Sequence, residues 1–227
     1  ITSIGAIITD RRKYKKEKAE RVRKYKDYIS RKKEQITSYR NEEKQLLNEK
    51  YYSASRELEM IRDFSADLFN RNPEDKDYLD VFLGTGRLEA IRQIDYQHQE
   101  KFEGDDELAE IPEKVAEEFR WIDDVPVVLT LNQNSATGVV GPEEIVYGFL
   151  KNITLDLAVR QYYGDLKLFY IIGEQDQERF HWLRLLPHVK NEVLGVRNIV
   201  CDGDSKNILF EFLYKELSRR ESQKISS

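Results

Sequence analysis

The stretch from Val125 to Val189 constrains the fold most, because strand, turn and helix signals follow one another closely. A short apolar run at 125–131 leads into a glycine-containing turn at 136–141. A helical pattern then begins at Pro142-Glu143-Glu144, and a second apolar run lies at 166–172. Strand, glycine turn, helix and strand is the order of nucleotide-binding α/β units, in which phosphate lies at the turn.

The side chains that would bind phosphate are missing from this turn. A P-loop places a Lys and a Ser or Thr directly after its last glycine, to neutralise the outer phosphates and to bind magnesium. Here Gly138 and Gly141 are followed by Pro142, Glu143 and Glu144. Carboxylates at a helix N-terminus complement the helix dipole and would repel a triphosphate. The turn therefore fits either a degenerate P-loop without nucleotide chemistry or an ordinary strand-to-helix connection, and we assign no catalytic or cofactor-binding residue to it.

Composition points to a solvated helix attached to a globular part. The chain has 227 residues, enough for one or two domains, and 35% of them are charged, which is high for one compact domain. The single cysteine, Cys201, excludes an internal disulfide. The three histidines are scattered and no Cys/His cluster is present, so no metal site is predicted.

Charge is distributed unevenly along the chain. The net charge is −5, but between Arg11 and Lys33 thirteen Lys and Arg face three Asp and Glu, a local net charge of +10 that leaves −15 for the rest. A basic segment of this kind indicates an anionic surface, either membrane headgroups or nucleic acid. The acidic remainder argues against nucleic acid as a partner. The residues expected nearest a membrane are Arg11, Arg12, Lys13, Lys15 and Lys16.

The first ten residues have a separate pattern. Residues 1–8 are mostly apolar and run directly into the basic segment. That order is typical of the last turns of a membrane helix followed by its cytoplasmic flank. Eight residues cannot span a bilayer, which needs about 20. We therefore expect residues 1–10 to be the truncated end of a transmembrane helix, with a poorly ordered N-terminus as the alternative.

Residues 11–72 are predicted to form a basic helical stalk. No Pro or Gly occurs between residues 11 and 69, and apolar residues recur at alternating spacings of three and four, which predicts a long amphipathic helix with coiled-coil character. A second helical stretch is expected at 58–69. The apolar seam positions are Val22, Tyr25, Ile29, Ile36, Tyr39 and Leu46, and two further seam positions hold Lys32 and Glu43.

Residues 73–227 are predicted to form an α/β module. Strands are expected at 78–83 and 87–96 around a glycine turn at 84–86, with a short helix at 108–121. A further strand at 196–201 precedes a final helix. The alternation predicts a mainly parallel, RecA/Rossmann-like P-loop-type sheet covered by helices, after the helical stalk.

Four segments taken together carry a family resemblance. The chain resembles the membrane-anchored ATPases of type VII secretion systems, the EssC/EccC proteins, which are a branch of the FtsK/SpoIIIE translocases. The first segment is the apolar end followed by the basic Tyr-rich helix at 11–39, and the second is Phe69-Asn70-Arg71-Asn72-Pro73 followed by Asp77-Tyr78-Leu79 and Leu83-Gly84-Thr85-Gly86. The third is Pro126-Val127-Val128-Leu129 running to Gly138-Val139-Val140-Gly141-Pro142, and the fourth is Phe169-Tyr170-Ile171-Ile172 with Trp182-Leu183-Arg184 and Leu186-Pro187-His188.

The resemblance implies a place within a larger machine. The chain would hold the linker after two membrane helices and a first ATPase-like module, truncated near Ser227, at the cytoplasmic side of a bacterial membrane. ATP and magnesium would belong to the full-length protein and not to this fragment. The implied partners are other secretion components, secreted substrates and further copies of the protein. Such a module would be non-catalytic and would couple the ATPase domains to the membrane complex; the alternative is an ATPase domain with an atypical nucleotide site.

Overall fold

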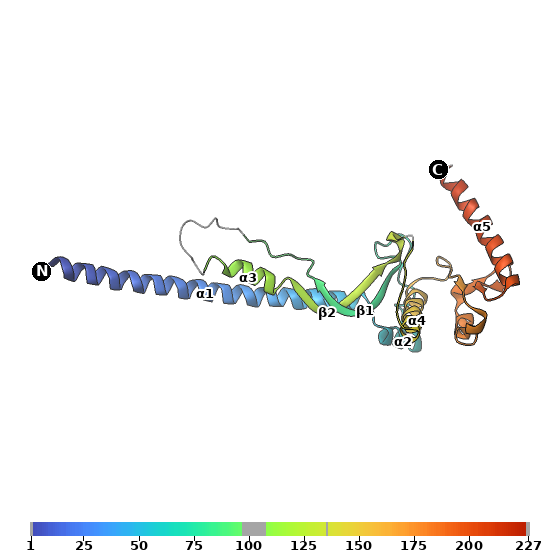
Figure 1. Ribbon diagram of the computed structural model, residues 1–227, viewed down its shortest axis with the longest axis horizontal. Helices are drawn as coiled ribbons and strands as arrows, with labels where there is room; N and C mark the ends of the chain where they lie inside the picture. The colour runs from blue at the N-terminus through green and yellow to red at the C-terminus, as the bar shows by residue number, and fades with distance from the viewer. Residues whose placement is uncertain (1, 97–107, 135, 226–227) are drawn as a thin grey trace. The chain divides into compact units, whose positions relative to one another are not determined.

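The computed structural model describes residues 2–96, 108–134 and 136–225 (Figure 1). It divides into two compact units. The first unit comprises residues 1–52 and 82–128, and the second comprises residues 53–81 and 129–227. The predicted domain boundaries at residues 10 and 72 remain predictions.

The long N-terminal helix is confirmed as α1 (Thr2–Lys50). It ends at Lys50, well before the end of the Pro- and Gly-free stretch, because a new helix, α2 (Ala54–Arg62), begins shortly afterwards with its own cap. Ser53 has extended backbone angles, and its side chain accepts a hydrogen bond from the Arg56 amide. Beyond Arg62 the chain forms turns and not the predicted helix to residue 69, since Phe64 and Phe69 have φ of 49° and 56°.

The inward face of α1 packs against its own unit. Val22, Tyr25, Ile29 and Ile36 are half-buried as the apolar spacing predicts, whereas Tyr39 and Leu46 are each 54% exposed. Arg40, Glu43 and Leu47 continue the inward face, which confirms the predicted seam position of Glu43. Arg40 and Leu47, one residue after the predicted Tyr39 and Leu46, are the ones that point inward. Helix α3 (Ile111–Glu118) lies alongside α1 in this unit, joined by a 2.5 Å ion pair between Lys33 and Glu118 (Figure 1).

Strands β1 (Asp80–Glu89) and β2 (Trp121–Thr130) form a two-stranded sheet. The predicted glycine turn at 84–86 is wrong, because β1 runs straight through both glycines. A Cβ on Gly86 would lie 2.8 Å from Val127 Cγ2, so glycine here permits close approach of the two strands. Past Glu89 the predicted second strand is absent from the described residues 90–96. Ala90, Ile122 and Val125 form this unit's core, with Leu47 packed against them.

In the second unit, α2 packs against α4 (Glu143–Arg160), and α5 (Gly203–Ile225) follows the last strand. The core here centres on Leu183, Val189 and Ile199. The remaining short elements are η1 (Leu131–Gln133), β3 (Tyr170–Ile171), η2 (Glu174–Asp176), η3 (His181–Leu185), η4 (Pro187–Val189), β4 (Lys190–Asn191), β5 (Val196–Arg197) and β6 (Ile199–Val200).

The described residues contain no Rossmann-like sheet, which corrects the predicted fold class to a mixed α/β fold with a long N-terminal helix. Each of the three sheets has two strands, and only β3 with β6 is parallel among the short pairs; β4 pairs with β5 in the antiparallel sense. The strands on either side of α4 also lie in different sheets, because β2 pairs with β1. The strand predicted at 166–172 is shorter than expected, because only two of these residues form β3. The Leu168 amide donates to the His188 carbonyl in η4 and not to a neighbouring strand.

Candidate functional site

The N-terminus of α4 follows the glycine-containing turn, which is where a P-loop protein would bind phosphate. The helix begins at Glu143, directly after Pro142, whose φ of −57° and ψ of 140° are non-helical. The Pro142 carbonyl accepts hydrogen bonds from the amides of Ile145 and Val146 at 2.9 and 3.0 Å. The helix prediction is therefore confirmed to within one residue, and proline stands where its missing amide costs nothing.

Both carboxylates at this helix start are engaged by one arginine. Arg179 Nη1 lies 2.5 Å from Glu143 Oε1, and Nη2 lies 2.7 Å from Glu144 Oε2. The two carboxylates are well exposed, so each ion pair alone is weak, but one guanidinium bridging two acids fixes their geometry. The three side chains retain a net charge of −1, which does not favour a polyphosphate.

Tyr147 and Trp182 hold Arg179 in place. The Arg179 guanidinium carbon lies 4.0 Å from the Tyr147 ring centroid, a cation–π contact. The Tyr147 hydroxyl donates to the Arg179 carbonyl at 2.8 Å and accepts from Trp182 Nε1 at 3.2 Å. Phe180 packs edge-on against Tyr147 at 5.2 Å between ring centroids. Together these contacts tie the first turn of α4 to residues 179–182, a connection that the sequence alone did not reveal.

The preceding loop does not form a tight glycine cradle. Neither Gly138 nor Gly141 has a positive φ. A Cβ on Gly138 would meet no heavy atom within 4 Å, and one on Gly141 would make an ordinary 3.7 Å contact with Val146. Val140 between them is 99% exposed. The local backbone therefore has no steric requirement for glycine, unlike a loop that wraps phosphate with its amides.

A buried charged cluster lies between α2 and α4, where sequence analysis had assigned no function. Glu57, Asp156 and Arg160 are 1%, 4% and 4% exposed, respectively. Burial raises the pKa of Glu57 to about 9, and the nearby Asp156 carboxylate adds to this effect. Arg160 Nε also donates to Asn70 Oδ1 at 2.9 Å. Glu57 is therefore protonated at neutral pH, and the cluster of three side chains is close to neutral overall.

His188 has a structural environment. Its Nε2 lies 2.8 Å from the carbonyl oxygen of Gln161, and both residues are fully buried. Burial lowers the pKa of His188, so its ring is neutral at neutral pH. Among the described residues, no group of three or more His, Cys, Asp or Glu could hold a metal ion.

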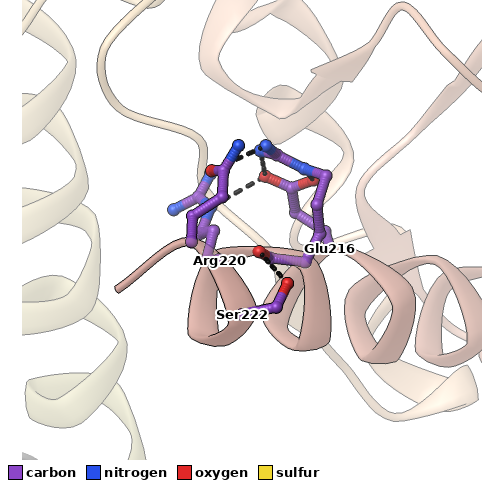
Figure 2. Close-up of polar contacts among 5 residues, drawn as sticks. Glu216, Arg220 and Ser222 are labelled. Atoms are coloured by element: carbon purple, nitrogen blue, oxygen red, sulfur yellow. Dashed lines mark hydrogen bonds and ion pairs between the residues drawn. The ribbon is translucent and has the colours of Figure 1, made fainter. Parts of the chain in front are cut away.

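A groove of about 680 Å³ in the second unit is bordered by α5 and includes Phe169, Phe212 and Leu217. Glu216 and Arg220 also line it, and Figure 2 shows these two side chains close together on α5, with Ser222 nearby. Hydrogen bonds from Arg219 and then Arg220 lower the pKa of Glu216 to about 2. Because these charges pair with one another, this groove presents no strong preference for a ligand of either sign.

The five basic residues expected near a membrane lie on the first part of α1. Each is exposed, and none forms an ion pair with another described residue. None of the helices in the described part of the chain has an apolar stretch that could cross a bilayer. The proposed membrane-helix end covers residue 1, which lies outside the described residues, and side chains at 2–9 that the structure does not describe. The five residues are Arg11, Arg12, Lys13, Lys15 and Lys16.

Comparison with known proteins gives a consistent relationship. The chain is 21% identical over 220 residues to the type VII secretion system protein EssC of Staphylococcus aureus, and 24% identical over 222 residues to the ESX secretion system protein YukB of Bacillus subtilis. The matches cover 97% of the chain. It is a distant homologue of EssC and YukB. The chain spans about 15% of the length of these curated relatives. No family model matches it.

The homology supports the family resemblance in its coarse form. The basic helix, β2 and the start of α4, which carried that resemblance, lie within a relationship that extends over almost the whole chain. The relation to EssC and YukB concerns secretion proteins as a class.

Proposed function

We propose that the chain is a stalk and a non-catalytic ATPase-like module of a bacterial type VII protein-secretion motor. It couples the cytoplasmic ATPase domains of a longer protein to the membrane complex, on the cytoplasmic side of the bacterial cell membrane. Its partners are other secretion components, secreted substrates and further copies of the same protein. This proposal extends the distant homology to EssC and YukB, whose names assign them to type VII and ESX secretion.

The main support for a non-catalytic role is that Arg179 forms ion pairs with both Glu143 and Glu144. A nucleotide at this helix start would need cationic side chains free to neutralise the triphosphate. Here the nearby guanidinium is already held by two carboxylates and by the Tyr147 ring. Taking Arg179 away to bind phosphate would leave two negative charges facing the same ligand. The unit therefore contributes attachment and shape.

Titration calorimetry with Mg-ATP tests this role. We expect no binding in the micromolar range, because the helix start is acidic and its loop is open. In a separate thermal unfolding measurement, Gly141→Ala should leave the midpoint temperature of unfolding unchanged, because the new Cβ would make only an ordinary van der Waals contact. Micromolar binding that is lost in Arg179→Met and in Gly141→Trp would instead establish the atypical nucleotide site, with Arg179 as its cation.

The basic start of α1 is proposed to lie against anionic headgroups. Each Lys or Arg near such a surface contributes about 1 kcal/mol, so a few suffice to orient a helix. We expect the chain to bind phosphatidylserine-containing vesicles in a salt-sensitive manner. Replacing all five residues, Arg11, Arg12, Lys13, Lys15 and Lys16, with Gln removes about 5 kcal/mol of this attraction and should weaken binding by about 4,000-fold. Vesicle sedimentation over a range of salt concentrations measures this.

A charge-matched variant provides the control for this experiment. It replaces five exposed basic residues outside the stalk and should bind vesicles as the wild type does. Equal losses in the two variants would show that net charge alone governs binding, and salt-independent binding would remove the electrostatic basis of the proposal. The control positions are Lys76, Lys151, Lys190, Arg197 and Lys206.

A further inference from the structure

A groove of about 530 Å³ follows the middle of α1, bounded by residues 92–96 and by α3. Its floor is apolar: Ile29 and Ile36 are half-buried, and Val115 from α3 is only 6% exposed. Tyr28 and Tyr39 line it as well and remain 47% and 54% exposed. The stripe that the sequence predicted as a coiled-coil seam is therefore only partly filled by this unit's own chain.

Aromatic side chains give the groove ordered walls. Tyr25 and Tyr28 stack with ring centroids 6.4 Å apart and an interplanar angle of 29°. Lys32 Nζ lies 5.7 Å above the Tyr28 ring and donates to Gln35 at 3.1 Å. Tyrosine is common among residues that dominate binding energy, because it offers a large contact area for little conformational entropy. The groove is thus already shaped for a ligand with apolar side chains.

The described residues that line the groove carry a positive charge. Among them are Lys32, Arg40 and Arg92 and one acidic residue, Asp95. Within the described residues Arg40 is paired with Glu43, whereas Lys32 and Arg92 are exposed and form no ion pair with another described side chain, so they are the cations at the rim that can face a ligand. Along α1, residues 21–33 add to this field with seven Lys and Arg and one Asp. From α3 this groove receives Pro112 and Val115, whereas Glu113 and Glu117 of the same helix line an adjoining hollow. Glu118 is paired with Lys33.

Charge disfavours a second copy of the chain as the occupant, and shape disfavours a bilayer. A second copy that docked here through its own α1 would set two basic helices against each other, and like charges facing each other across an interface are unfavourable. A bilayer surface is flat on this scale, whereas the apolar floor is recessed between α1, α3 and residues 92–96. A separate helix with acidic and aliphatic faces satisfies both the recess and the charge.

We propose that this groove binds an acidic amphipathic helix from a partner protein. Aliphatic side chains spaced at i, i+3 or i+4, and i+7 would lie on Ile29 and Ile36, and flanking carboxylates would face Lys32 and Arg92. Residues 25–39 of α1 extend about 21 Å, which matches roughly four turns of the partner helix. This inference goes beyond the proposed function, since it depends on the groove and not on the chemistry at the start of α4.

Fluorescence anisotropy with the full chain tests the proposal. The probe is a labelled four-turn peptide with a Leu stripe and Glu on its other faces, and a second peptide carries Lys in place of Glu. We expect saturable binding of the acidic peptide only. The double variant Lys32→Glu with Arg92→Glu should weaken it at least about tenfold, equal to roughly 1.4 kcal/mol, and Tyr28→Ala should do the same.

Matched controls lie on the same helix outside the groove. Lys18→Glu and Tyr14→Ala alter exposed residues of α1 and should retain the wild-type affinity to within about twofold after correction for long-range charge. Because Lys32 and Arg92 are exposed, their charge reversal does not depend on refolding of the core, and circular dichroism checks the helix content of each variant.

Several results would overturn the proposal. They include absence of acidic-peptide binding, equal binding of the basic peptide, and groove variants that bind as well as the controls. Self-association in sedimentation velocity that is lost in Ile36→Ser would identify a second copy as the occupant. Vesicle binding that requires Tyr28 would identify a lipid surface. The Mg-ATP titration is independent of all of these, so failure of one proposal does not imply failure of the other.

Discussion

Replacing Glu57 with Gln should remove most of the stability loss that the wild type shows as pH rises from about 4.5 to about 9. Glu57 has a raised pKa in the folded state, caused first by burial and then by Asp156. The contribution of its protonated form is therefore complete below the unfolded pKa of 4.5 and is lost as pH approaches the folded pKa. Linkage gives about 1.4 kcal/mol per pH unit, or roughly 3 kcal/mol between pH 4.5 and 7. Glutamine keeps the shape and never ionises.

Urea denaturation at several pH values measures this effect. Glu57→Gln should have a flatter profile than the wild type and should be the more stable of the two near pH 8. Glu59→Gln is the matched control on the same helix, because Glu59 is exposed and pairs only at the surface with Arg56. A wild-type profile that stays flat over this range, or Glu57→Gln and wild-type profiles that run parallel, would contradict the buried protonated state of Glu57.

Replacing Arg40 with Met should destabilise the first unit by about 3–5 kcal/mol, the typical cost of removing one partner from a buried ion pair. Arg40 donates to the Phe119 carbonyl at 2.9 Å and to the Arg92 carbonyl at 2.7 Å, and it pairs with Glu43 at 3.2 Å. Both side chains of the pair are about 10% exposed. The substitution would leave two carbonyl oxygens and one carboxylate without their cationic donor, although Glu43 would still accept from the Ile91 amide at 2.6 Å.

Thermal and urea unfolding check this expectation, with Lys44→Met as the control. Lys44 pairs with Asp124 at 3.4 Å across an exposed surface, so its loss should cost less than about 1 kcal/mol. Combining Arg40→Met with Glu43→Gln should recover part of the loss, since no unpaired carboxylate would remain. If Arg40→Met and Lys44→Met were equally mild, Arg40 would not be the residue that attaches α1 to the rest of its unit.

Local patterns predicted the helices well because helix signals lie within a few residues of one another. The Pro- and Gly-free basic stretch predicted α1, and Pro142 with two glutamates predicted the start of α4. The prediction of sheet pairing was wrong because strand partners lie far apart in the sequence. An apolar run indicates a buried extended segment but does not specify its partner, so β2 and β3 were placed in one sheet although they pair with β1 and β6.

In the candidate sites too, local residues could be predicted from the sequence and distant partners could not. Glu143 and Glu144 could be recognised beside the glycine turn, but Arg179 lies far along the chain and no periodic pattern connects it to them. The burial of Glu57 could not be predicted from the sequence either, because a glutamate in a polar helix is normally a surface residue. Only the packing of α2 against α4 places its carboxyl group beside Asp156 and Arg160.

The contacts along α1 have a mechanical consequence. From Lys33 to Leu47 the helix packs against α3 and the residues around β1 and β2. By contrast, every side chain from Asp10 to Arg21 is exposed. A bare helix has much less bending stiffness than one braced along its side. A sideways force on α1 would therefore bend the helix between Asp10 and Arg21, while the segment from Lys33 to Leu47 would move as a rigid body.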